Sequence, residues 1–226
     1  MDEGDIQRAL DATEREVDVG HAPDLRALGF WRAVQAVKRD RALVERHATR
    51  IAAIDRQAFR RHVRLVFPVG LGIFLVSGGL VVDLVLLAVA PALERPWREI
   101  ILLVGAAGLD VATHGLAHLV VGTLVGIRFT DWFLDVPKKP QPGFKIDYAS
   151  YLRASPRQRA WMHASGAIVT KLTPFAVILY ALAIGADAWA IALLFAVGIL
   201  QILSDLLFSV KSSDWKKFRR EMRLAR

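Results

Sequence analysis

Four long apolar segments constrain this chain more than any other feature of its sequence. A helix needs about 20 apolar residues to cross a bilayer, because each residue adds 1.5 Å of rise. Segments of this kind run from Leu65 to Leu93, Ile100 to Ile127, Ala160 to Ala186 and Ala188 to Val210. The hydrophobic share of 54% and the mean hydropathy of +0.35 exceed those of ordinary globular proteins. We therefore predict an all-α integral membrane protein with four transmembrane helices.

The distribution of lysine and arginine predicts the orientation of these helices, because basic residues accumulate on the cytoplasmic side. Residues 38–64 contain nine basic and three acidic side chains, residues 128–159 seven and three, and residues 211–226 seven and two. The short connections "ERPWRE" and "GADA" carry no basic excess. We expect a multi-pass protein of the cell membrane with both termini and the middle loop in the cytoplasm. The net charge of +8 then indicates contact with anionic lipids and gives no support to a nucleic-acid partner.

Three regions follow from this pattern: an N-terminal cytoplasmic region over 1–64, the transmembrane domain over 65–210, and a basic cytoplasmic tail over 211–226. Residues 1–18 are expected to form a short helix or a frayed arm. The next stretch is predicted to be an amphipathic helix with a basic face, which either lies on the inner leaflet, packs against the bundle or recruits a partner protein. Its apolar residues recur at helical spacing at Phe30, Trp31, Val34, Val37, Val44, Ile51, Ile54 and Phe59.

Two cytoplasmic segments of the prediction are less regular. The middle loop contains "VPKKPQPG", in which three prolines and a glycine cannot continue a helix. This loop is either a lipid-surface segment or a flap that admits a substrate segment. The tail "KSSDWKKFRREMRLAR" is predicted to form a basic amphipathic helix capped by Ser213 or Asp214.

Ionisable side chains inside the predicted spans point to a functional site, because such residues are costly in a bilayer and usually have a partner or a role. The chain has no cysteine, so a metal site would have to use histidine, aspartate, glutamate and water. The ionisable residues within the spans are Asp83, Asp110, His114, His118, Lys171 and Asp205. Lys171 could pair with Asp110 or Asp83, or stabilise an oxyanion.

The stretch "DVATHGLAHLVVG" places Asp110, His114 and His118 on one helix face at i, i+4 spacing. Two histidines so spaced can share one metal ion, as in the zincin motif H-E-x-x-H, although here Gly115 stands in place of the glutamate. Counted from the predicted outer ends of the second and fourth spans, Asp205 lies at about the depth of His118. We therefore hypothesise a zinc site made of His114, His118 and Asp205.

The passage "THGLAHLVVGTLVGIRF" resembles the zinc-binding helix of the site-2 protease family of intramembrane metalloproteases. Within "SGAIVTKLTPF", Gly166 matches the glycine of the family's Gly-Pro-x-x-Asn element, while Ala167 and Thr170 replace its proline and asparagine. The stretch "ILSDLLFSV" would supply the late aspartate ligand as Asp205, without the usual Leu-Asp-Gly signature. The resemblance covers about residues 100–210.

This resemblance implies zinc bound by His114, His118 and Asp205, and cleavage of a membrane-embedded substrate segment by a water activated on the metal. Since Gly115 removes the usual base, Asp110 is the nearest replacement. Three functions stay open at this point: a zinc hydrolase with an altered base, an inactive relative that binds transmembrane segments as an adaptor, and a small transporter or proton relay built on the intramembrane aspartate, histidine and lysine residues.

Overall fold

The structure is mostly helical (77%), and its described residues also form one small sheet. The structure, a computed structural model, describes residues 1–19, 23–135, 139–207 and 213–225. The chain divides into two compact units. Unit 1 comprises Met1–Val69, Thr123–Pro156 and Leu224–Arg226, and unit 2 comprises Gly70–Gly122 and Arg157–Arg223. The middle loop therefore groups with the N-terminal helices. The regions predicted from the sequence, with boundaries at residues 64 and 210, had included this loop in the transmembrane domain.

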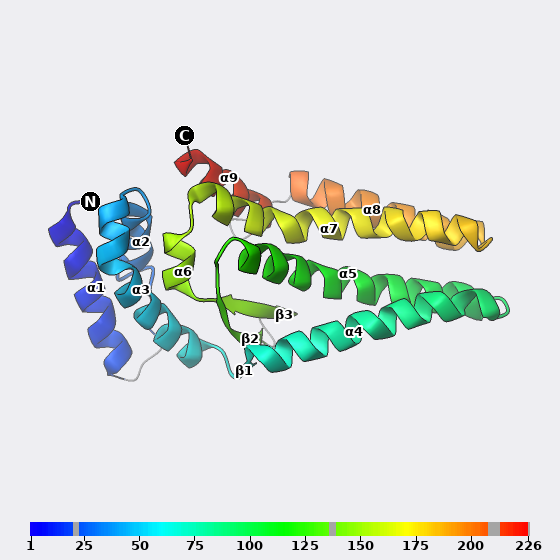
Figure 1. Ribbon diagram of the computed structural model, residues 1–226, viewed down its shortest axis with the longest axis horizontal. Coiled ribbons are helices and arrows are strands. Elements are labelled where there is room, and N and C mark those ends of the chain that lie inside the picture. Colours follow the sequence, from blue (N-terminus) through cyan, green and yellow to red (C-terminus); the bar gives the residue numbers. More distant parts are fainter. Residues whose placement is uncertain (20–22, 136–138, 208–212, 226) are drawn as a thin grey trace. The chain divides into compact units, whose positions relative to one another are not determined.

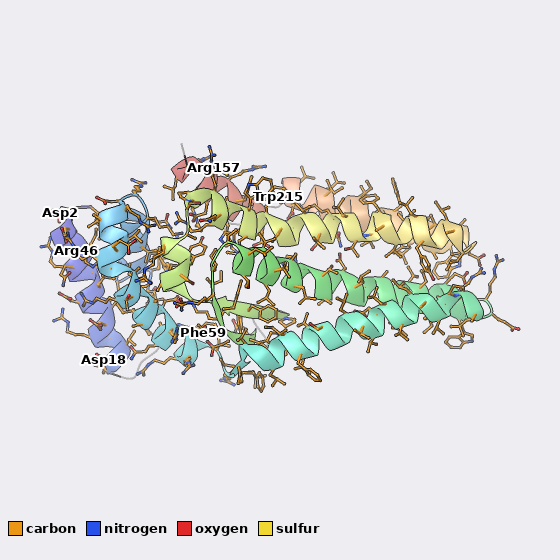
Figure 2. The ribbon with its side chains drawn as sticks, viewed as in Figure 1. Asp2, Asp18, Arg46, Phe59, Arg157 and Trp215 are labelled. Carbon is orange, nitrogen blue, oxygen red and sulfur yellow. The ribbon has the colours of Figure 1, made fainter. Side chains whose placement is uncertain are left out.

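Unit 1 begins with three helices: α1 (Glu3–Asp18), α2 (Phe30–Val37) and α3 (Arg41–His62). Figure 2 marks Asp2 and Asp18 at the two ends of α1. The stretch from Phe30 to His62, expected to be one amphipathic helix, is two helices, since Asp40 caps the start of α3 by accepting hydrogen bonds from two backbone N–H groups. The apolar faces pack on one another and on Leu152, and form the core of this unit. These helices therefore bury their apolar residues among themselves.

A three-stranded antiparallel sheet completes unit 1, in the order β1 (Leu65–Pro68), β2 (Phe129–Asp135), β3 (Lys139–Ile146), followed by α6 (Tyr148–Arg153). Val66 pairs with Phe133, and Trp132 pairs with Phe144. Pro140 and Pro142 of the middle loop fall in β3, an edge strand, where the lack of a donor N–H is tolerated. The all-α prediction did not include this sheet. Residues 136–138, part of the predicted loop, lie outside the described residues.

Two ion pairs join the sheet to α3. Lys145 Nζ lies 2.5 Å from Asp55 Oδ2, and Arg60 Nη2 lies 3.2 Å from Asp131 Oδ1. Burial raises the pKa of Asp55, and the neighbouring Lys145 charge opposes that rise. The middle loop is thus a paired, anchored element and not a loose connection.

Unit 2 contains α4 (Val69–Val89) with the short 3-10 helix η1 (Ala90–Ala92), α5 (Trp97–Leu124), α7 (Pro156–Ala183), α8 (Ala188–Leu207) and α9 (Asp214–Leu224). Among the described residues, four helices are long and apolar enough to cross a membrane, which confirms the prediction of four such segments. They correspond to α4 with η1, α5, α7 and α8 (Figure 1). The first helix starts at Val69 instead of Leu65, because the preceding residues form β1 up to Pro68. The predicted end of the fourth span at Val210 and the start of the tail lie outside the described residues.

The four long helices are joined in pairs by short connections that contact each other. Arg95 Nη2 lies 2.8 Å from Asp187 Oδ1, and the buried Glu99 accepts a hydrogen bond from the Asp187 N–H. Leu102, Ala106, Val177 and Leu194 form a small apolar core nearby. Large apolar side chains such as Phe74 and Leu179 point outward, as expected of helices that face lipid.

Candidate metal centre

His114 and His118 lie on one face of α5, as their spacing predicted. Their ring centroids are 4.7 Å apart, and the two rings are perpendicular. His118 is six residues before the end of α5 at Leu124, or about 9 Å along the helix axis. The pair therefore lies toward one end of the helix and not at its middle.

Helix α7 fixes the orientation of both imidazoles. His118 Nδ1 lies 2.7 Å from the carbonyl oxygen of Met162, which can only accept, so this nitrogen carries the hydrogen. His114 Nδ1 lies 2.8 Å from the hydroxyl of Thr170, which donates its own hydrogen to the Gly166 carbonyl oxygen and therefore accepts from the ring. With both Nδ1 atoms protonated, the Nε2 atom of each neutral ring presents a lone pair. That is the tautomer of a metal ligand.

Gly166 allows α7 to approach the histidines closely. A Cβ atom at this position would lie 2.7 Å from two ring carbons of His118 and closer still to its Nε2. A side chain at position 166 would thus displace the ring. The glycine that the sequence matched to the site-2 protease element stands directly against His118.

The third member of the site is Asp214, the first residue of α9. Its Oδ2 lies 3.2 Å from His118 Nε2 and 3.6 Å from His114 Nε2. Lys217, one turn further along α9, contacts the other oxygen, Oδ1, at 2.9 Å, and so keeps Oδ2 turned toward the histidines. From the sequence, Asp214 was expected only as a helix cap. That role falls to Ser213, whose Oγ accepts a hydrogen bond from the Lys216 N–H.

The charge of Asp214 suits a site for a cation. Burial acts to raise its pKa, but the contact with His118 and the nearby Lys217 charge outweigh burial and hold the pKa below its usual range. Asp214 is therefore a carboxylate at neutral pH. Its oxygen faces two nitrogen lone pairs when the histidines are neutral, an arrangement that a proton or a metal ion must stabilise.

The distances from Asp214 to the two histidines match the ligand spacing of a tetrahedral zinc ion. The three ligand atoms all lie within 4.8 Å of one another. Ligands about 2.0–2.1 Å from a tetrahedral zinc are about 3.3 Å apart, close to the 3.2 and 3.6 Å found between Asp214 and the two histidines. The side chains of His114, His118 and Asp214 are 27%, 17% and 17% exposed, so water can reach a fourth position. Each ligand is also held by a hydrogen-bonding partner, which metal sites usually require.

The other predicted site residues lie in different surroundings. Asp205, expected as the third ligand, forms an ion pair with Lys171 and does not belong to the His–Asp group found among the described residues. Lys171 thus pairs with Asp205, whereas the sequence had suggested Asp110 or Asp83 as its partner. Asp83 is buried against Gly108 of α5, where a larger residue would collide with its carboxylate.

Asp110, the candidate base, is one turn before His114 and bonds to another helix. Its Oδ2 accepts a hydrogen bond of 2.9 Å from Gln201 of α8. Its Oδ1 is buried and has no hydrogen-bond partner among the described residues. Within the part of the chain that the structure describes, the His–Asp group contains no second carboxylate. The position that a zincin gives to its base is occupied by Gly115.

Comparison with known proteins returned no matching family model, no matching curated protein and no matching solved structure. The resemblance to site-2 proteases therefore rests on the motifs of α5 and α7, and the function is inferred from the site itself.

Proposed function

We propose that this chain is an integral membrane zinc-binding protein whose metal centre consists of His114, His118 and Asp214. The observation that carries the proposal is the convergence of one ligand atom from each of His114, His118 and Asp214 within 4.8 Å, with both Nδ1 atoms bound to α7. The four apolar helices support a location in the membrane. The proposed centre lies near one end of α5.

The chemistry of such a centre is hydrolytic in type. When bound, zinc supplies a Lewis acid that acidifies water and polarises a carbonyl oxygen. The residues around it hold the ligands: Thr170 and the Met162 carbonyl orient the two rings, and Lys217 orients Asp214. A water activated on zinc is what the resemblance to the intramembrane metalloproteases implies.

Proton transfer is the step for which this site is poorly equipped. Gly115 offers no side chain, and Asp110 is bonded to Gln201. Loss of a positioned base costs on the order of 10² to 10⁴ in rate. We propose that the protein binds transmembrane segments of other proteins at this centre and cleaves them slowly, as a relative of the site-2 proteases with a lost base.

Metal content and peptide cleavage test this function together. Purified without chelators, the protein should contain about one zinc per chain, and H114A/H118A should contain none. Wild type should cleave a model transmembrane peptide slowly, and Gly115→Glu should cleave it faster. The variant Asp110→Asn should retain both zinc and the slow cleavage.

Each contrary outcome removes a specific part of the proposal. A metal-free wild type would contradict the zinc centre and favour a polar path through Asp110, Lys171 and Asp205. Efficient cleavage by wild type that Asp110→Asn abolishes, with zinc retained, would show that Asp110 serves as the base. Zinc binding without cleavage in either wild type or Gly115→Glu would leave only the adaptor role.

A further inference from the structure

Helix α9 has two chemically different sides. Its exposed basic residues follow one another at intervals of three, one and three positions, which places them on one helical face. We call this the α9 basic face, formed by Lys216, Arg219, Arg220 and Arg223. In contrast, Glu221 is fully buried. This face is a row of cations on the outside of unit 2.

The other side of α9 is fastened to α7. Arg159 Nε donates a hydrogen bond of 2.6 Å to Glu221 Oε2, with both side chains at most 1% exposed. Phe218 packs against Trp161 of α7 and Trp215 of α9, each at 5.7 Å between ring centroids. Figure 2 shows Arg157 at the start of α7 and Trp215 on α9. The buried ion pair and the aromatic contacts therefore define a docked position of α9.

The aromatic residues indicate how deep α9 lies. Trp161 is 54% exposed although it belongs to an apolar spanning helix, and it lies in the second turn of α7. Tryptophan side chains gather at the level of lipid headgroups. If α7 crosses the membrane, the α9 basic face lies at the same level, within reach of phosphate groups.

The same helix supplies the third ligand of the metal centre. Asp214 is the first residue of α9, and Lys216, the first residue of the basic face, is only two positions later. An isolated helix of 11 residues is marginal in water, so α9 presents Asp214 and an aligned row of cations only while it is docked. Anything that binds that row favours the docked helix, and with it the complete set of ligands.

We propose that the α9 basic face binds anionic phospholipid headgroups and that this binding strengthens zinc binding at His114, His118 and Asp214. The inference rests on the proposed zinc centre. The occupant is a membrane surface because the face is cationic, lies beside an exposed tryptophan and belongs to the same unit as the four apolar helices. By linkage, zinc should strengthen the binding of α9 to anionic lipid by the same factor.

Zinc affinity measured in two lipid compositions tests the proposal. The full chain is placed in nanodiscs of phosphatidylcholine alone or of phosphatidylcholine with phosphatidylglycerol, and zinc is titrated against a competing chelator. We expect zinc to bind about fivefold or more tightly with phosphatidylglycerol present. High salt should abolish the difference, because it shortens the screening length to about 3 Å at 1 M.

Two charge-matched variants identify the surface involved. K216Q/R219Q/R220Q/R223Q should bind zinc as wild type does in phosphatidylcholine and should lose the gain from phosphatidylglycerol. The control R26Q/R32Q/R39Q/R61Q removes the same charge from unit 1 and should keep the gain. If both variants lost the gain in zinc affinity equally, the assignment of lipid binding to α9 would be overturned.

A label on α9 adds a measurement that does not depend on zinc affinity. Since the chain has no cysteine, Ala225→Cys can carry a single spin label just beyond α9, and zinc should reduce its mobility more when phosphatidylglycerol is present. Equal zinc affinity in the two lipids, or weaker binding with phosphatidylglycerol, would overturn this inference while the zinc centre stands. No zinc binding in either lipid would overturn the proposed function and the inference with it.

Discussion

Replacing Gly166 by alanine should remove His118 from the metal centre. The new Cβ atom would lie 2.7 Å from His118 Cδ2 and Cε1, whereas ordinary contacts begin at 3.4 Å. The ring would therefore have to move by at least about 0.7 Å. Metal–ligand distances tolerate only about 0.2 Å. The ring cannot yield freely, because its Nδ1 is bonded to the Met162 carbonyl oxygen.

The expected loss in zinc affinity is at least about 100-fold, since losing a ligand costs more than losing a group that orients one. Overpacking should also destabilise the fold by about 1–3 kcal/mol. The affinity is measured by competition with a chromophoric chelator in detergent, and the stability by thermal unfolding of the same samples. The variant should remain folded, so that the two effects can be separated.

Gly79→Ala provides the matched control. Gly79 lies on α4, and a Cβ atom there would meet nothing within 4 Å, so zinc affinity should be unchanged. A folded Gly166→Ala protein that binds zinc as tightly as wild type would refute the placement of His118 in the centre. An equal loss of zinc affinity in Gly79→Ala would refute this placement as well.

Three further predictions concern the groups around the centre. Thr170→Val, which removes the hydroxyl that accepts from His114 Nδ1, should weaken zinc binding about 10- to 100-fold in the same competition assay; unchanged affinity would show that the ring is held by other groups. Glu221→Gln leaves the charge of Arg159 buried without its carboxylate and should destabilise the protein by about 3–5 kcal/mol, visible as a lower Tm, whereas the double variant R159M/E221L should recover most of this loss. Lowering the pH from about 7.5 to about 5.5 should weaken zinc binding, because protons compete with zinc for nitrogen ligands. Asp214, whose pKa is held low, stays ionised over this range, so zinc titrations that show no pH dependence would argue against histidine ligands.

Local periodicity was enough to predict the two histidines of the site. The i, i+4 rule places His114 and His118 together on any helix, and apolar length alone marks the four long helices. The third ligand required information that depth along a helix does not contain. Asp205 is at a suitable depth, but it pairs with Lys171. Which face of α8 meets α5 depends on packing and not on residue counting.

Asp214 lies in the segment that was predicted to form a basic amphipathic helix, and it was expected there only as a helix cap. One signal was available: the tail has two acidic residues among seven basic ones, and Asp214 and Glu221 are seven positions apart, on one helix face. Both contact other helices of unit 2, Asp214 through His118 of α5 and Glu221 through Arg159 of α7. In this basic helix, the two acidic residues indicated which side contacts the other helices.

The sheet was missed for a different reason. The middle loop was interpreted from its prolines and glycine, which do break a helix. Yet "FTDWFLD" is rich in the aromatic residues that strands favour, and a structureless loop of about 30 residues is uncommon in a compact domain. Strand β1 was hidden because its apolar residues were counted with the first span.

X-ray absorption at the zinc edge tests the central claim most directly, with the zinc-loaded wild type compared with Asp214→Ala and Asp205→Ala. We expect two imidazole nitrogens and one carboxylate oxygen, all at about 2.0–2.2 Å from zinc, in the wild type. Asp205→Ala should give the same spectrum, and Asp214→Ala should lose the carboxylate oxygen and keep both imidazoles. A wild-type spectrum without imidazole scattering, or one that changes with Asp205→Ala and not with Asp214→Ala, would contradict the proposed centre.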